Sequence, residues 1–98
     1  MAKVRIGQEA ETEYTEALAW YQARSMRAAE GFEAAFAEVV DRIEQSPEQF
    51  PLCDEEGFRF AILDRCPYSL IYRVIESTAQ VVAVAHARHK PGYWAGRL

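Results

Sequence analysis

The hydrophobic period of this chain changes at a loop that spans residues 47–57. Before the loop, apolar side chains recur at helical spacing, which predicts one helix over residues 8–24 and a second from Ser25 to Ser46. The second helix has to end there because the residue before Pro47 is disfavoured in α-helical geometry. Its broad apolar stripe consists of Phe32, Ala35, Phe36, Val39, Val40 and Ile43.

After the loop, apolar residues alternate with others, as is typical of strands in a layered domain. Three strands with short connections, predicted at residues 58–63, 68–75 and 80–86, make an antiparallel meander, and a short leading strand is predicted before the helices at residues 3–7. The sequence therefore predicts an α+β fold in the order β-α-α-β-β-β. In this fold a helical hairpin packs on a small antiparallel β-sheet.

The chain has 98 residues, half of them hydrophobic, which suits a single domain over residues 1–98 with one modest core. It has no apolar stretch long enough to span a membrane, and its N-terminus lacks the features of a secretion signal. The two cysteines, Cys53 and Cys66, lack the spacing of a zinc site. We therefore expect a cytoplasmic protein with free thiols, no metal and no cofactor.

The net charge of −4 conceals an uneven distribution along the chain. Residues 1–57 carry five Lys and Arg against thirteen Asp and Glu, whereas residues 58–98 carry six against two. The C-terminal part can thus present a basic surface to nucleic acid or to an acidic protein, although the whole chain is acidic. The alternative is that the helical carboxylates only keep the protein soluble and that the arginines are scattered.

Residues 86–97 bring an imidazole, fixed positive charges and aromatic rings to the end of an apolar strand. Cleavage of RNA by its own 2′-hydroxyl needs a proton acceptor, cations around the phosphate and a donor for the leaving oxygen. Histidine titrates near neutral pH, arginine holds phosphate, and aromatic rings stack on bases. The catalytic candidates, if the protein is a nuclease, are Arg59, His86, Arg88 and Tyr93. The candidates for binding a target or an acidic partner are Arg59, Arg73, His86, Arg88, Trp94 and Arg97.

Arg59 and Arg73 both occupy odd-numbered positions of their strands, so we expect them on one face of the sheet. Plainer structural roles stay open for the candidates. The two arginines can pair with helix carboxylates, and His86 can be a hydrogen-bonded residue at a strand end. Trp94 can pack the C-terminal segment onto the sheet, because an indole buries a large apolar area.

Several short motifs follow one another along nearly the whole chain. They are Ala19-Trp20-Tyr21, Phe32 with Phe36, Ser46-Pro47, Phe58-Arg59, Pro67-Tyr68-Ser69-Leu70-Ile71-Tyr72, Ala83-Val84-Ala85-His86, and Pro91-Gly92-Tyr93-Trp94 with Arg97. In this order and spacing the sequence resembles the RelE/ParE superfamily of toxins from bacterial type II toxin–antitoxin systems. More narrowly, it resembles the ParE-like plasmid stabilisation branch of that superfamily.

The resemblance implies a growth-inhibitory toxin that a cognate antitoxin, encoded by the adjacent gene, binds and neutralises. ParE-type members act on DNA gyrase, whereas RelE-type members enter the ribosome and cut messenger RNA. Arg59 matches a sheet arginine that RelE-type nucleases also carry, and His86 lies near where some of them use a histidine. The lysine pair that several of them carry is missing, however, and Lys90 is the one lysine after the loop. We therefore expect action on gyrase. A ribosome-dependent endoribonuclease and a non-toxic, degenerate member of the fold are the alternatives, and a homodimer or a toxin–antitoxin hetero-oligomer is the expected assembly.

Overall fold

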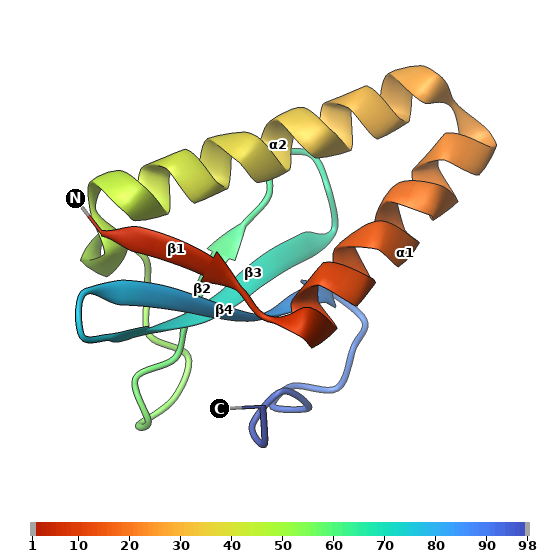
Figure 1. The fold of residues 1–98 in the computed structure, drawn as a ribbon. Coiled ribbons are helices and arrows are strands. Elements are labelled where there is room, and N and C mark those ends of the chain that lie inside the picture. Colours follow the sequence, from red (N-terminus) through yellow and green to blue (C-terminus); the bar gives the residue numbers. More distant parts are fainter. Residues whose placement is uncertain (1, 98) are drawn as a thin grey trace.

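The computed structural model describes residues 2–97, whose fold is shown in Figure 1. Two helices lie along one side of a four-stranded sheet, and a short 3₁₀ helix, η1, follows the second of them. In chain order the elements are β1 Lys3–Ile6, α1 Gln8–Arg24, α2 Met26–Gln45, η1 Pro47–Gln49, β2 Arg59–Ile62, β3 Tyr68–Ile75 and β4 Thr78–His86. The predicted α+β class and the predicted element order are confirmed.

A single serine separates the two helices and serves both of them. The backbone N–H of Ser25 donates to the carbonyl of Tyr21 at the end of α1, at 2.9 Å. Its Oγ accepts from the N–H of Ala28 in the first turn of α2, at 3.2 Å. Serine is a preferred N-cap because its hydroxyl satisfies a helix N–H that otherwise lacks a partner. α2 ends at Ser46, before Pro47, as the sequence predicts.

The strands lie in the order β1-β4-β3-β2. β2, β3 and β4 form the predicted antiparallel meander, whereas β1 joins β4 in parallel, so the sheet is mixed. Parallel neighbours need a long crossover connection, and the chain between β1 and β4, which contains both helices, provides it. After β1, the N–H of Gly7 donates to the carbonyl oxygen of Val81 at 2.9 Å. A Cβ on Gly7 would meet that oxygen at 3.1 Å, so glycine permits this close approach.

The turn between β3 and β4 is tighter than the sequence predicts. β4 begins at Thr78 instead of residue 80, because the turn contains only Glu76 and Ser77. Both residues have positive φ angles, 50° and 66°, as a two-residue hairpin turn of type I′ requires. β3 and β4 therefore remain paired up to Ile75, whereas the pairing of β3 with β2 stops at Tyr72, opposite the first residue of β2.

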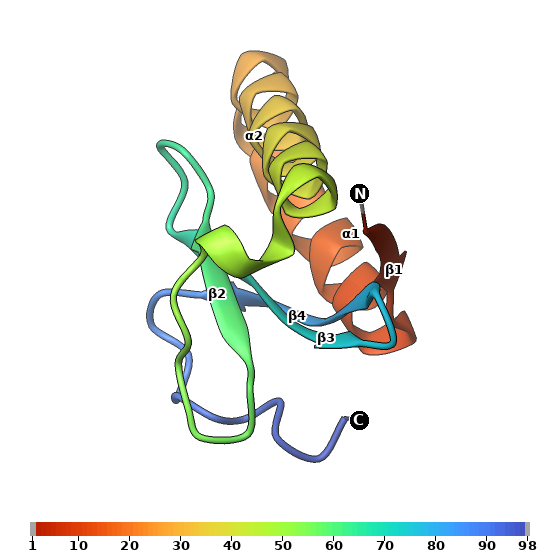
Figure 2. The same cartoon turned by 90° about the vertical axis from the view of Figure 1, so that its left-hand side faces the viewer.

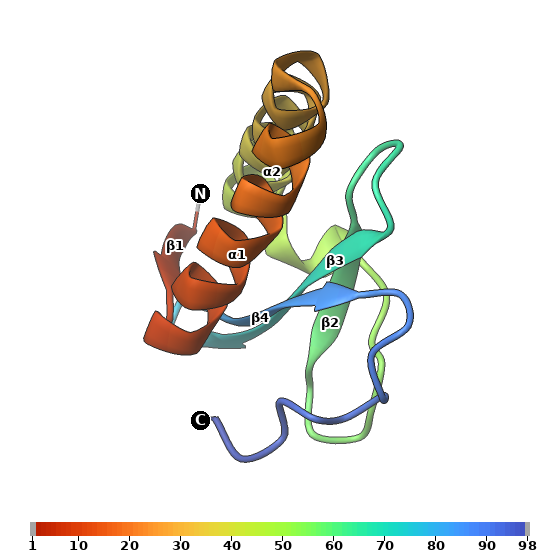
Figure 3. The ribbon, with the colours of Figure 1, turned by 90° about the vertical axis from the view of Figure 1, so that its right-hand side faces the viewer.

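Both faces of the sheet are covered (Figures 2 and 3). The main core lies between the sheet and the helices, where Phe32, Leu70 and Tyr72 are fully buried. A second core lies on the opposite face, beneath the C-terminal segment, which we define as residues 87–97. This second core consists of Phe58, Ile71, Val82, Ala83, Ala85 and Trp94. Trp94 is only 9% exposed, which confirms that it packs the C-terminal segment onto the sheet.

Candidate functional site

The predicted site residues occupy two ends of the sheet. At one end, Arg59 begins β2 and lies opposite Tyr72 of β3. At the other end, His86 closes β4 and lies opposite Tyr68, four residues earlier on β3. Four residues of strand span about 13 Å, and Leu70 is buried on the same face between them. Arg59 and His86 therefore do not meet in one centre.

Arg59 fastens the start of β2 to the loop that precedes it. Its Nη1 donates to the carbonyl oxygens of Glu48, at 3.2 Å, and of Phe50, at 2.6 Å. Within the described residues, Arg59 forms no ion pair with a helix carboxylate. The neighbouring Tyr72 donates its hydroxyl to the carbonyl of Pro47, and burial raises the pKa of Tyr72 to about 12. Arg59 and Tyr72 together hold η1 and the following loop against the sheet.

Arg73 lies on the other face of the sheet, so the expected shared face with Arg59 is wrong. Because Arg59 is opposite Tyr72, odd positions of β2 share a face with even positions of β3. The Arg73 guanidinium instead lies over the ring of Phe58, 4.9 Å from its centroid. Its Nη1 donates to the carbonyl oxygen of Glu56 at 3.4 Å. The side chain of Arg73 thus lies over the second core and contacts the loop before β2.

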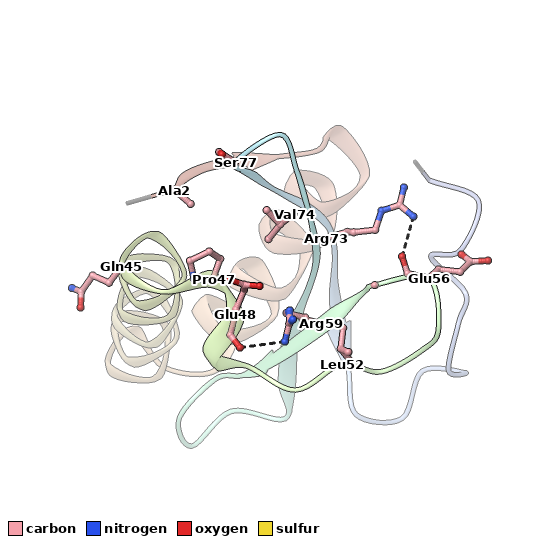
Figure 4. Close-up of a pocket in the computed structure, with 11 residues that line it drawn as sticks. Ala2, Gln45, Pro47, Glu48, Leu52, Glu56, Arg59, Arg73, Val74 and Ser77 are labelled. Atoms are coloured by element: carbon pink, nitrogen blue, oxygen red, sulfur yellow. Dashed lines mark hydrogen bonds between the residues drawn. The ribbon is translucent and has the colours of Figure 1, made fainter.

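The two arginines nevertheless line one cavity of about 550 Å³, which we call the β3 trough (Figure 4). Its walls come from η1, from the loop around Leu52 and Glu56, and from β3 at Val74. Figure 4 shows Arg59 and Arg73 on two neighbouring strands, with Arg59 directed towards Glu48 and Arg73 towards Glu56. The trough is larger than the cavities beside α2 and beside His86 that are described below.

His86 is held by contacts that suit a structural residue. Its ring meets that of Tyr68 edge-on, with the centroids 5.0 Å apart. Its Nδ1 accepts from the backbone N–H of Arg88 at 3.0 Å, so in the neutral imidazole the proton resides on Nε2. Two small cavities, of about 180 and 170 Å³, meet His86 and the exposed His89. Of the predicted catalytic set, only Arg88 lies in the turn directly after His86.

Glu13 of α1 ties the C-terminal segment to the rest of the molecule, and the sequence analysis did not identify it. Oε1 of Glu13 accepts from Nη1 of Arg97 and from the N–H of Val84, both at 3.0 Å. Oε2 accepts from the hydroxyl of Tyr93 at 2.8 Å and from Nη2 of Arg97 at 3.2 Å. Arg97 also donates to the carbonyl of Val82 at 2.9 Å. Burial, and then the bond to Glu13, raise the pKa of Tyr93. We call this set of contacts the Glu13 clasp.

Two of the predicted site residues, Tyr93 and Arg97, use their polar groups for hydrogen bonds within this clasp. It also satisfies the edge of β4 beyond β1, where Val82 and Val84 lack a neighbouring strand. Cations that remain exposed at this end of the molecule are Arg88 and Lys90. Between them, His89 stacks on Tyr93, with the ring centroids 4.3 Å apart.

A groove follows the outer side of α2. Two cavities, of about 390 and 370 Å³, lie between this helix and the hairpin loop that contains Asp64 and Arg65. Small residues, Gly31 and Ala34, line its floor, and the exposed Ile62 stands at one end. We call this the α2 groove, and its shape suits a helix or an extended segment of a partner.

Two absences apply to the described residues 2–97. Neither helix is long and apolar enough to cross a membrane. No group of three or more His, Cys, Asp or Glu side chains is placed to hold a metal ion.

These features define a small α+β domain with a helical hairpin on one face of its sheet and a C-terminal segment clasped to the other. The chain belongs to the ParE toxin family, since the family described as the ParE toxin of the type II toxin–antitoxin system, parDE, matches residues 4–91. A solved chain from the chromosomal ParDE TA system from P. aeruginosa shares the fold, with a TM-score of 0.75 and 20% identity. The similarity covers 88% of this chain and 96% of that chain. A comparison with curated proteins finds no match.

Proposed function

We propose that this protein is a growth-inhibitory toxin that acts on DNA gyrase and is neutralised by a cognate antitoxin encoded by the adjacent gene. The observation that carries the proposal is the family match, which extends over both helices and the antiparallel meander. Gyrase is an intracellular enzyme, so the proposal requires the protein to work in the cytoplasm. The neutralised form is a toxin–antitoxin hetero-oligomer.

The arrangement of the candidate residues favours binding over RNA cleavage. A nuclease centre needs its proton acceptor and its cations around a single phosphate. Arg59 and His86 lie at different ends of the sheet, and Arg59 already donates to two backbone carbonyls. Tyr93 and Arg97 are engaged by Glu13. A toxin that only binds its target does not need a proton acceptor and cations gathered around one phosphate.

We assign the contact with gyrase to the turn after β4. Arg88 and Lys90 are exposed in this turn, and within the described residues neither forms an ion pair. Their positive charges can meet an acidic surface of the enzyme, which increases both the association rate and the specificity of binding. The ring of His89, which lies between Arg88 and Lys90 in the sequence, stacks on that of Tyr93 and so fixes the conformation of this turn.

Induced expression, combined with a supercoiling assay on purified gyrase, tests the proposal. The wild-type protein should arrest growth, induce the DNA-damage response and inhibit supercoiling. The double variant Arg88→Ala, Lys90→Ala should inhibit about tenfold less, because it removes two charges from the contact. Arg65→Ala is the matched control, since this arginine is also exposed but lies in a different turn. Equal inhibition by all three proteins would rule out the assigned contact.

Variants of His86 separate the two toxin mechanisms. His86→Ala should keep its toxicity, because a gyrase-binding toxin needs no general base. A translation block that a folded His86→Ala protein no longer causes would identify a ribosome-dependent endoribonuclease instead. The absence of any growth effect at high expression would identify a non-toxic member of the fold.

Co-purification tests the antitoxin partner. Failure of the toxin to co-purify with the product of the adjacent gene would contradict neutralisation by that product.

A further inference from the structure

We propose that the β3 trough binds an extended, acidic segment of the antitoxin as an additional strand beside β3. The inference rests on the proposed function, because it identifies where the neutralising partner binds. Three features of the trough carry it. They are an open strand edge, a cavity beside that edge, and two guanidinium groups that form no ion pair with any of residues 2–97.

The open edge belongs to the last residues of β3. The N–H of Phe60 donates away from β3, to the carbonyl of Pro51 at 3.2 Å, so the polar backbone groups of Arg59 face β3. The backbone N–H and C=O of the opposite residue, Tyr72, therefore face β2. Val74, two residues further along β3, presents its N–H and C=O on the same side. No residue of β2 lies opposite it, because β2 begins at Arg59, opposite Tyr72. Among residues 2–97, Val74 has no backbone partner from the surrounding loops.

The loop before β2 keeps this edge open. Gly57, which would otherwise extend β2 alongside Val74, has a φ angle of +96° and turns the chain away. The carboxylate of Asp54 fixes the turn by accepting from the N–H groups of Glu56 and Phe58, at 3.0 and 3.1 Å. The resulting cavity of about 550 Å³ lies within the usual size range of ligand pockets.

The two arginines indicate the charge of the occupant. Arg59 and Arg73 line the same cavity (Figure 4), and within the described residues neither forms an ion pair. Each uses Nη1 to bind backbone carbonyls, and other N–H donors of each guanidinium remain for a carboxylate.

The exposed side chains of Glu48 and Glu56 also line the trough, so a small free anion meets repulsion there. A carboxylate carried by a peptide backbone fits better, because strand hydrogen bonds to β3 add to its affinity.

Strand geometry determines the spacing of the acidic residues in the partner. Successive side chains of a strand point to opposite faces. Arg59 and Arg73 lie on opposite faces of the sheet, so two acidic residues at odd spacing can reach both of them. At even spacing, both carboxylates lie on one face and engage only one arginine.

Two capped peptides of equal composition test this spacing, Thr-Val-Glu-Glu-Val-Thr and Thr-Glu-Val-Glu-Val-Thr. Each is titrated into the intact, isotope-labelled protein and followed by the NMR shifts of backbone amides. The first peptide should shift the amides around Arg73 and Val74 and should bind about tenfold more tightly than the second. Equal affinities would overturn the inference, as would shifts confined to the α2 groove. Inorganic phosphate should leave these amides unshifted, and phosphate shifts as large as those of the peptide would show an anion site instead.

Variants of the edge give an independent test. Val74→Pro removes the exposed N–H and spares the β3–β4 ladder, because this N–H faces away from β4. It should abolish binding of the first peptide, whereas Val74→Thr, which keeps the N–H, should retain it. If Val74→Pro does not fold, Arg73→Gln replaces it, with about tenfold weaker binding and loss of the spacing preference expected. Unchanged binding by a folded Val74→Pro or Arg73→Gln protein would overturn the inference.

A displacement experiment identifies the occupant. The antitoxin, produced from the adjacent gene, should displace the first peptide from the toxin. If the antitoxin binds the toxin without displacing the peptide, the trough is not its site, and only this inference fails. If displacement occurs but the toxin has no effect on gyrase, only the gyrase proposal fails.

Discussion

Glu13 and Arg97, 84 positions apart in the sequence, form a bidentate ion pair with N–O distances of 3.0 and 3.2 Å. The side chains are 17% and 19% exposed, respectively, so water screens the pair only in part. The same carboxylate accepts hydrogen bonds from Tyr93 and from the backbone of Val84. One side chain on α1 therefore joins the helical layer, the edge of the sheet and the C-terminal segment.

Substitution of this carboxylate should destabilise the fold. Glu13→Gln keeps the shape but removes the charge, and it leaves the guanidinium of Arg97 partly buried without a counter-charge. We expect the free energy of unfolding to fall by about 2–3 kcal/mol, as measured by urea denaturation. Glu16→Gln, on the same helix but exposed, should change it by less than about 0.5 kcal/mol. Equal stability of the two variants would show that the Glu13 clasp contributes little.

Arg59 should prove structural when stability and activity are measured together. Arg59→Ala removes the donors to the carbonyls of Glu48 and Phe50, so the free energy of unfolding should fall by about 1–3 kcal/mol. Hydrogen exchange should accelerate in the loop before β2. Arg65→Ala, at an exposed arginine, serves as the control and should be nearly neutral. Lost toxicity in Arg59→Ala with unchanged stability and exchange would instead assign this arginine to target binding.

The two serines that border α2 offer a matched pair. Ser25→Ala removes the side-chain cap on the N–H of Ala28 and should cost about 1 kcal/mol. Ser46→Ala should cost much less, because the side chain of Ser46 forms no capping hydrogen bond to the 3₁₀ helix that follows it. Thermal unfolding of both variants under one set of conditions provides the measurement. A larger loss for Ser46→Ala would contradict the capping geometry.

Alkaline pH should weaken the fold through its buried tyrosines. Burial raises the pKa of Tyr72 to about 12, whereas an unfolded tyrosine titrates near 10. Above about pH 10 the unfolded chain releases a proton that the native state keeps, so stability is complete below this pH and falls towards about pH 12. Tyr72→Phe should reduce the slope of stability against pH by up to about 1.4 kcal/mol per pH unit. Urea denaturation at several alkaline pH values checks this, and an unaltered slope would refute it.

The helices could be predicted closely from the sequence because their signals are local. The apolar stripe of α2, the capping Ser25 and the break at Pro47 all act within a few residues, and the observed helices match the expected bounds. The parallel position of β1 depends on contacts more than seventy residues apart. Periodicity predicts that strand but cannot specify its neighbour.

The arrangement of the site was harder to predict for the same reason. The faces of Arg59 and Arg73 depend on the pairing of β2 with β3, and a register change of one residue exchanges the faces. Glu13 did leave a signal, since a carboxylate between the buried Ala10 and Ala17 interrupts the apolar face of α1. A charge in that position implies a partner, but the identity of the partner, Arg97, follows only from the folded chain.

The parallel contact between β1 and β4 determines when the molecule can become complete. β1 pairs with β4, so its backbone groups find their strand partner only after both helices, β2 and β3 have been synthesised. The C-terminal cation that closes the Glu13 contacts emerges later still. Folding of this domain is therefore completed only after β4 and the C-terminal segment have both been synthesised.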